Sequence, residues 1–81
     1  MGVLRVMSRR GDDRVTWDVR QVEMGDPEAL AAVREAERIF REQQTGGATA
    51  FRVESGRALV RVDDFDSAAE QIVVVPLLVG G

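Results

Sequence analysis

The side chains of this sequence that could do chemistry are carboxylates, hydroxyls and guanidinium groups. The chain has 81 residues with no cysteine, histidine or tyrosine, and all 11 of its basic residues are arginine. It therefore has no thiol nucleophile and lacks histidine, the commonest general base and metal ligand. We expect no catalytic residue, no bound metal and no bound cofactor, and we predict that the protein is not an enzyme.

The last two residues, Gly80 and Gly81, offer a reactive group of another kind, the terminal carboxylate. A carboxylate resists nucleophiles until one of its oxygens becomes part of a good leaving group. Two glycines leave no Cβ beside the carbonyl carbon and let the backbone enter a narrow groove in conformations that other residues avoid. On this interpretation the chain is the substrate of a partner enzyme. The competing interpretation is an uninformative chain end.

Two other candidate sites have simpler explanations. Asp63, Asp64 and Asp66 lack the glycine and the distal glutamate of a calcium-binding loop, so we expect a solvated turn there. Trp17 lies in an alternating segment, which favours packing in the core or at a sheet edge over ligand binding.

The charge balance limits the partners. Arg9, Arg10 and Arg14 form no basic patch because Asp12 and Asp13 lie among them. The formal net charge is −3 at pH 7, whereas phosphate binding needs a positive field. No apolar run approaches the about 20 residues of a membrane span, and the first residues lack a signal-peptide pattern. We predict a cytoplasmic protein that binds neither nucleic acid nor membrane.

A β-hairpin is predicted at the start of the chain. Residues 3–7 have the composition of a strand, and residues 14–19 alternate, with Trp17 and Val19 on one face. Residues 8–13 between them are polar and typical of a turn.

One amphipathic helix should follow. Asp26 can cap it, Pro27 suits the first helical position, and Glu28 complements the helix dipole. Apolar residues then recur at helical spacing as far as Phe40, and the glycines at 46–47 end the helix.

The second half of the chain predicts three more strands. Residues 49–54 and 57–62 alternate around 55–56, which indicates a hairpin with a tight two-residue connection. Residues 63–70 are polar and are expected to form at most one helical turn, capped by Asp66 or Ser67. Residues 72–75 are β-branched throughout, as in a buried central strand.

These elements predict an α+β fold in the order β-β-α-β-β-β. A helix with one apolar face packs most economically across one face of a mixed sheet. The last strand should lie centrally and parallel to the first, because the long connection between them permits parallel pairing. This arrangement is a β-grasp. We expect a single domain over residues 1–78 and a flexible Gly-Gly tail over residues 79–81.

The stretch from Phe65 to Gly81 resembles the C-terminal third of the MoaD/ThiS-type sulfur carriers, which belong to the ubiquitin-like β-grasp superfamily. In these proteins a polar turn leads into a β-branched strand, then proline, a few small or apolar residues and a terminal Gly-Gly. Pro76 matches this pattern, whereas residues 67–70 replace the family's acidic-glycine turn and Leu77 replaces a second proline. Bacterial or phage ubiquitin-like proteins with the same ending fit equally well.

The resemblance implies that a ubiquitin-activating-type adenylyltransferase joins the Gly81 carboxylate to AMP from ATP. The acyl-adenylate is then captured by sulfur, as in a sulfur carrier, or passed to an amine of a target protein. Both outcomes stay open. In either case ATP and magnesium are used by the partner, and the product goes to a downstream sulfur acceptor or to the modified protein.

The sheet face that the helix leaves uncovered is the expected docking surface for this enzyme. Alternate residues of the last strand face opposite sides of the sheet. The predicted docking residues are Val73, Val75, Leu77, Leu78 and Val79. The alternatives are that arginine stems and loops cover this face or that a homodimer buries it.

A second function, from another class, is a non-covalent β-grasp interaction module, for example in phage or virion assembly, whose Gly-Gly tail has no role. Replacing Gly81 with a bulky residue would then leave function intact.

Overall fold

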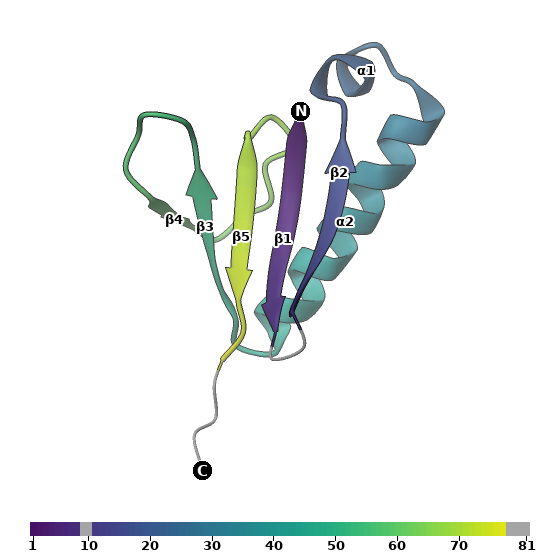
Figure 1. Ribbon diagram of the computed structural model, residues 1–81. Coiled ribbons are helices and arrows are strands. Elements are labelled where there is room, and N and C mark those ends of the chain that lie inside the picture. Colours follow the sequence, from purple (N-terminus) through teal and green to yellow (C-terminus); the bar gives the residue numbers. More distant parts are fainter. Residues whose placement is uncertain (9–10, 78–81) are drawn as a thin grey trace.

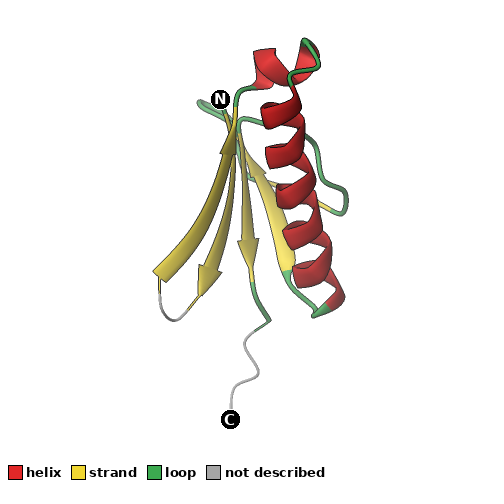
Figure 2. Ribbon diagram, turned by 90° about the vertical axis from the view of Figure 1, so that its right-hand side faces the viewer, coloured by secondary structure: helices red, strands yellow, loops and turns green. Residues whose placement is uncertain are grey.

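A five-stranded mixed sheet and one main helix make up the fold of the computed structural model (Figure 1), which describes residues 1–8 and 11–77. The helix lies on one face of the sheet (Figure 2). In chain order the elements are β1 (Gly2–Ser8), β2 (Gly11–Trp17), α1 (Val19–Glu23), α2 (Pro27–Thr45), β3 (Thr49–Val53), β4 (Val60–Val62) and β5 (Gln71–Val75).

The strands lie in the order β2-β1-β5-β3-β4. β1 and β5 are parallel, with Val3 opposite Gln71 and Val6 opposite Val74, and the other neighbouring strands are antiparallel. The prediction that the last strand is central and parallel to the first is therefore confirmed.

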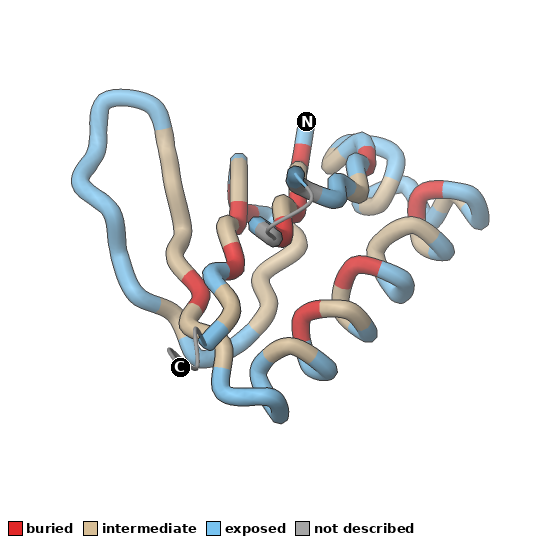
Figure 3. Tube along the Cα trace, turned by 60° about the horizontal axis from the view of Figure 1, so that its bottom comes forward, coloured by how far each residue is buried: buried red, intermediate tan, exposed pale blue. Residues whose placement is uncertain are grey.

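The core lies between the sheet and α2 (Figure 3). On β5, Ile72 and Val74 are buried, whereas Val73 is half-buried and Val75 is exposed. Each large aliphatic or aromatic side chain removed from water stabilises the fold by about 1.5–3 kcal/mol. The largest fully buried side chains are Phe40, Leu4, Ile72 and Val74. The β-branched run thus supplies two of them.

The N-terminal hairpin is longer than predicted. Gly2 pairs with Trp17 and Ser8 pairs with Gly11, so residues 11–13 belong to a strand and not to a long polar turn. The predicted strand position of Val19 is wrong, because that residue begins α1.

Asp18 explains where the strand ends. Its carboxylate accepts hydrogen bonds from Arg20 N at 2.9 Å and Gln21 N at 3.4 Å, which caps α1. This short helix was not predicted, and it adds one element to the expected order.

Helix α2 is confirmed with its predicted ends. Asp26 accepts a hydrogen bond from Ala29 N at 3.0 Å, and Pro27 is the first helical residue. After Thr45 the chain turns through Gly47, whose φ of +93° is in the left-handed region that favours glycine.

The hairpin of β3 and β4 differs from the prediction. Its strands are joined by residues 54–59 and not by a tight two-residue connection, and β4 pairs with β3 only from Val60 to Val62. Ser55 and Gly56 do form a turn, in which Arg57 N donates to Glu54 O at 3.1 Å.

A contact distant in sequence draws this turn away from β4. The carboxylate of Glu70 accepts hydrogen bonds from Ser55 N at 3.0 Å and from Ser55 Oγ at 2.8 Å. The turn is thereby tied to the start of β5, and the connection to β4 opens into a wider loop.

The segment 63–70 forms a hydrogen-bonded turn in place of the predicted helical turn. Asp66 Oδ1 accepts from Ala68 N at 2.9 Å and Asp66 O accepts from Ala69 N at 3.1 Å. Ala69, whose N–H closes this turn, is buried in the core. Within residues 1–8 and 11–77, no helix has the length and apolar character needed to cross a bilayer.

Candidate functional site

The face of the sheet opposite α2 presents a mixture of apolar and cationic side chains. Strand register places Arg14, Arg5, Val73, Phe51 and Arg61 in one row across all five strands. These residues alternate with the buried ones, so they lie on the side away from the helix. We call this surface the open face. Its apolar members are Val3, Met7, Phe51, Val53, Val73 and Val75.

The most exposed apolar residues of the open face lie at one end of the sheet. Met7 is 47% exposed and Val75 is 37% exposed. Met7 and Val75 directly follow Val6 and Val74, the last residues paired between β1 and β5, so they are neighbours at the ends of adjacent strands. The chain leaves β5 at this end, through Pro76 and Leu77.

Arginines lie on both sides of the apolar centre. Arg5 and Arg14 are on the side of β1 and β2, and Arg61 is on β4 at the opposite edge. A partner that covers the apolar centre would therefore gain from carboxylates at both rims. In the sequence, each of these arginines occupies a strand position that alternates with apolar residues. The strand order is needed to bring the three arginines into one row across the sheet.

Of the predicted docking residues, the structure brings Val73 and Val75 together and places Leu77 apart from them. Val73 and Val75 both lie on the open face, next to Phe51 and Thr49 respectively. Leu77 is 62% exposed, and its side chain lies against the connection between α2 and β3. A Cβ built on Gly47 would be 3.1 Å from Leu77 Cδ2.

The remaining predicted site residues lie outside the described part of the chain. They are Leu78, Val79, Gly80 and Gly81, for which the activation chemistry and part of the docking surface were predicted. Their roles stay predictions. Leu77 is the last described residue before them, and it emerges beside the end of α2.

The acidic cluster forms a turn in which Asp63 and Asp64 are exposed, as predicted. Asp66 caps it and also lies 3.6 Å from Arg52 Nη1, and Asp63 O accepts a hydrogen bond from Gln44 Nε2 at 2.5 Å. No three acidic, histidine or cysteine side chains in the described residues are arranged to hold a metal ion.

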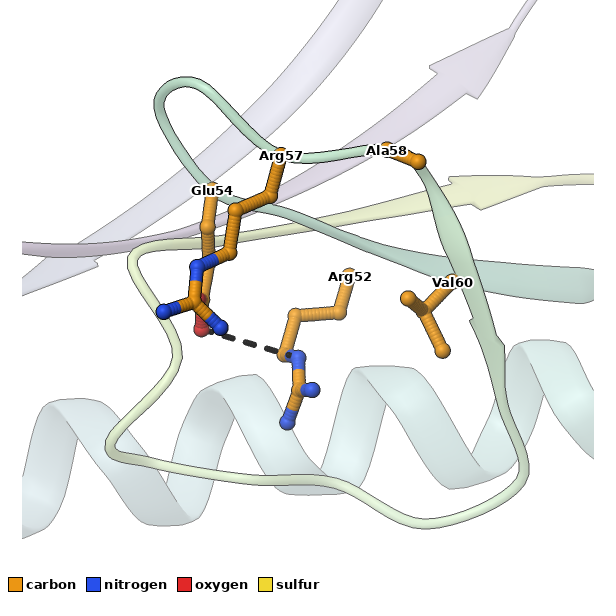
Figure 4. A pocket seen from close by; sticks show the side chains of 5 residues that line it. All are labelled: Arg52, Glu54, Arg57, Ala58 and Val60. Atoms are coloured by element: carbon orange, nitrogen blue, oxygen red, sulfur yellow. Dashed lines mark ion pairs between the residues drawn. The ribbon is translucent and has the colours of Figure 1, made fainter.

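A hollow of about 60 Å³ lies under the loop between β3 and β4 (Figure 4). Arg52, Glu54, Arg57, Ala58 and Val60 line it, and Arg52 Nε lies 3.6 Å from Glu54 Oε1. Pockets for small molecules usually span about 300–1,000 Å³. The hollow therefore has room for little more than water.

Trp17 is a core residue, as predicted. Its indole is buried, its Nε1 donates to Ser67 O at 2.9 Å, and its ring centroid lies 5.5 Å from that of Phe65. The hydrogen bond satisfies the only polar group of the ring. Trp17 is therefore not available as a platform for a ligand.

Two perturbed carboxylates also have structural explanations. Hydrogen bonds from the backbone and side chain of Ser55 lower the pKa of Glu70, and a hydrogen bond from Arg38 lowers the pKa of Glu35 on α2. Both groups are exposed, and neither lines the hollow under the loop between β3 and β4. They stabilise a loop contact and a helix surface.

Comparison with protein-family models, curated proteins and solved structures gives no match. Function is therefore inferred from the open face and from the segment that leaves it at Leu77.

Proposed function

We propose that the protein is a ubiquitin-like β-grasp carrier or modifier whose Gly81 carboxylate is adenylated by an activating enzyme. The observation that carries the proposal is the position of the exposed pair Met7 and Val75, at the end of the sheet from which the chain leads towards Gly80 and Gly81. A partner docked on this pair would be close to the segment that carries the reactive carboxylate.

The arrangement of elements supports the β-grasp assignment. β5 lies in the middle of the sheet, parallel to β1, and one long helix crosses one face between two hairpins (Figures 1 and 2). The short helix α1 is an addition that lies beyond the end of β2.

The open face supplies the docking surface in this proposal. Val73 and Val75 give it an apolar centre, and Arg61 adds positive charge at one edge. The fitting partner surface is apolar with carboxylates at its rim, because buried apolar area gives affinity and opposite charges give specificity and association rate.

The proposed chemistry needs only the terminal carboxylate from this chain. A carboxylate oxygen of Gly81 attacks the α-phosphorus of ATP, the new C–O–P linkage forms, and magnesium pyrophosphate leaves. A sulfur nucleophile or an amine then attacks the carbonyl carbon and AMP leaves. ATP, magnesium and the second nucleophile come from partners, so the chain contributes no catalytic residue.

The decisive test is ATP–pyrophosphate exchange by an adenylyltransferase encoded beside this protein's gene, with the protein as the carboxylate substrate. We expect exchange that depends on this chain and is lost in Gly81→Val. Intact mass spectrometry then separates a thiocarboxylate, formed by replacement of oxygen with sulfur, from a covalent adduct on a target amine. Absence of exchange with a mature protein that ends at Gly81 contradicts the proposal.

The second candidate is a non-covalent interaction module, which the open face favours because docking there needs no tail chemistry. Deletion of Gly80 and Gly81 separates the two functions. An interaction module keeps partner binding and biological function after the deletion, whereas a carrier keeps binding and loses transfer.

A further inference from the structure

Leu77 lies directly against the backbone of Gly47, in the connection between α2 and β3. A Cβ built on Gly47 would lie 3.1 Å from Leu77 Cδ2 and 3.5 Å from Leu77 Cβ. The α hydrogen that glycine carries in this direction therefore points at the Leu77 side chain. We call this the Leu77–Gly47 contact.

The strand register explains why these two residues meet. Thr49 lies opposite Val75, the last residue of β5. Two positions further along the same antiparallel register, Gly47 comes opposite Leu77. The connection between α2 and β3 and the segment after β5 lie at the same end of the sheet (Figure 1). The chain that leaves β5 is thus guided along this connection.

Gly47 differs from the other glycines with a left-handed backbone. Positive φ angles are found at Gly11, Gly25, Gly47 and Gly56. At the other three, a Cβ would have no atom of the described residues within 4 Å, whereas at Gly47 it would meet Leu77. Glycine at position 47 therefore meets two needs, the left-handed turn after α2 and the close approach of Leu77.

Both sides of the Leu77–Gly47 contact are held by the backbone. Gly47 N donates to Gln44 O at 3.0 Å, which ties the connection to the last turn of α2. On the other side, the ring of Pro76 fixes its own φ and restricts Val75 to extended backbone. Few soft torsions therefore remain between the sheet and Leu77.

The contact matters more for the segment that follows than for the core. Leu77 is 62% exposed, so its burial adds little to the stability of the fold. Gly81 comes four positions later in the sequence. Holding Leu77 limits the places from which this last segment can start. A reacting group that is partly ordered beforehand costs less entropy to place in a partner's site.

We propose that the Leu77–Gly47 contact positions the chain for activation, by fixing where the segment that carries Gly81 leaves the fold relative to the open face. Leu77 is then a positioning residue and not a docking residue. This inference rests on the proposed adenylation of Gly81.

Nuclear Overhauser spectroscopy of the protein alone tests the contact without any enzyme. We expect cross peaks between the Leu77 methyl protons and the Gly47 α protons. Their absence overturns the inference and leaves the proposed function standing.

The ATP–pyrophosphate exchange assay tests the positioning role. Leu77→Ala should lower kcat/KM at least about fivefold, because the segment then starts from many more positions. Leu77→Met should keep most of the activity, since its flexible apolar side chain can still lie across Gly47. Leu59→Ala is the matched control, because Leu59 is 64% exposed and lies in the loop between β3 and β4, and it should have no effect.

A pair of glycine variants tests the other side of the contact. Gly47→Ala and Gly25→Ala both place a Cβ at a positive φ, +93° and +79° respectively, so both strain the backbone. Gly47→Ala also fills the space that Leu77 occupies, whereas Gly25→Ala meets no described atom within 4 Å. We expect Gly47→Ala to lower kcat/KM and Gly25→Ala to leave it unchanged, with circular dichroism confirming that both are folded.

Binding of the protein without Gly80 and Gly81 separates positioning from docking. In this truncated protein, Leu77→Ala should leave the Kd for the adenylyltransferase unchanged. A Kd that rises as much as kcat/KM falls makes Leu77 a docking contact and overturns the inference. So does exchange that neither Leu77→Ala nor Gly47→Ala reduces, while the proposed function stands. Absence of exchange with wild type overturns the proposed function and this inference with it.

Discussion

The indole of Trp17 occupies the space in which Gly2 has no side chain. The two residues are paired across β1 and β2, and a Cβ built on Gly2 would lie 2.3 Å from Trp17 Cε2. From this position Trp17 Nε1 reaches Ser67 O at 2.9 Å. One aromatic residue therefore joins the N-terminal hairpin to the turn that leads into β5.

A side chain at position 2 should displace this ring. We expect Gly2→Val to lower the free energy of unfolding by about 1–3 kcal/mol, because overpacking forces the indole from its site. Urea denaturation followed by circular dichroism measures the change. Gly46→Ala is the matched control, since a Cβ there meets its nearest backbone atom at 3.4 Å and needs no rearrangement. Equal effects from the two substitutions contradict this account.

The Trp17 hydrogen bond can be tested separately from the packing of its ring. Trp17→Phe removes the Nε1 donor and leaves Ser67 O without this partner. We expect a loss of about 2–4 kcal/mol, which combines the unsatisfied carbonyl with a partly empty site. Phe65→Leu keeps the donor and removes the ring contacts to Trp17 and Phe40, so it should cost less. A smaller loss for Trp17→Phe than for Phe65→Leu would show that the hydrogen bond contributes little.

The Ser55–Glu70 contact predicts a specific pH dependence. Hydrogen bonds from the backbone and side chain of Ser55 lower the folded-state pKa of Glu70 below the ordinary range of a glutamate. The contact therefore stabilises the fold fully above the pKa of an unfolded-state glutamate, and this stabilisation is lost as the pH falls through the lowered folded pKa. Unfolding free energies measured across this acid range should fall less steeply for Glu70→Gln than for wild type.

Two controls define that experiment. Ser55→Ala removes the hydroxyl donor and keeps the backbone donor, so its pH profile should lie between wild type and Glu70→Gln. Glu23→Gln removes a carboxylate on the exposed surface of α1. If its profile changes as much as that of Glu70→Gln, the effect is one of net charge and not of the Ser55 contact.

If the activating enzyme docks on the open face, a substitution at an exposed position of this face should weaken docking and leave the stability of the fold nearly unchanged. Val75→Glu adds a carboxylate to a position that is already 37% exposed, so stability should change by less than about 1 kcal/mol. In the exchange assay kcat/KM should fall at least about tenfold, because a charge is buried against the apolar part of the partner. Met24→Glu makes the same change at an exposed methionine in the turn between α1 and α2 and should have no effect.

Arg61→Glu should act on the same surface through charge. We expect slower association that becomes less dependent on salt, because a rim cation that steers the partner is removed. Unchanged kinetics for both Val75→Glu and Arg61→Glu would place the docking surface elsewhere.

Elements with local signals were predictable from the sequence. The Asp26 cap, Pro27 and the apolar spacing define α2, and the β-branched run defines β5, because each depends on neighbouring residues alone. Helix α1 was missed because the alternation through Trp17 extends to Val19 and outweighed the capping role of Asp18.

Features that depend on distant contacts were not predictable. The open loop between β3 and β4 depends on Glu70, which lies 15 positions after Ser55. The placement of arginines at both edges of the open face depends on strand order. This order puts Arg14 on one edge strand and Arg61 on the other. The Gly81 chemistry remains a prediction, supported by where the chain leaves the sheet.

Parallel pairing of β1 and β5 has a practical consequence for experiments. Both strands begin at the same end of the sheet, and Val3 lies opposite Gln71, so Met1 is about seven residues, or roughly 23 Å, along the strand direction from the point where the chain passes Pro76. Because these 81 residues contain no lysine, a protein prepared to begin at Met1 and to carry this sequence alone offers an amine-reactive dye or resin one attachment point, its α-amino group. Coupling at this amine gives a protein that carries one label and is attached in one orientation. The end of the sheet near Pro76 then stays accessible to the enzyme under assay.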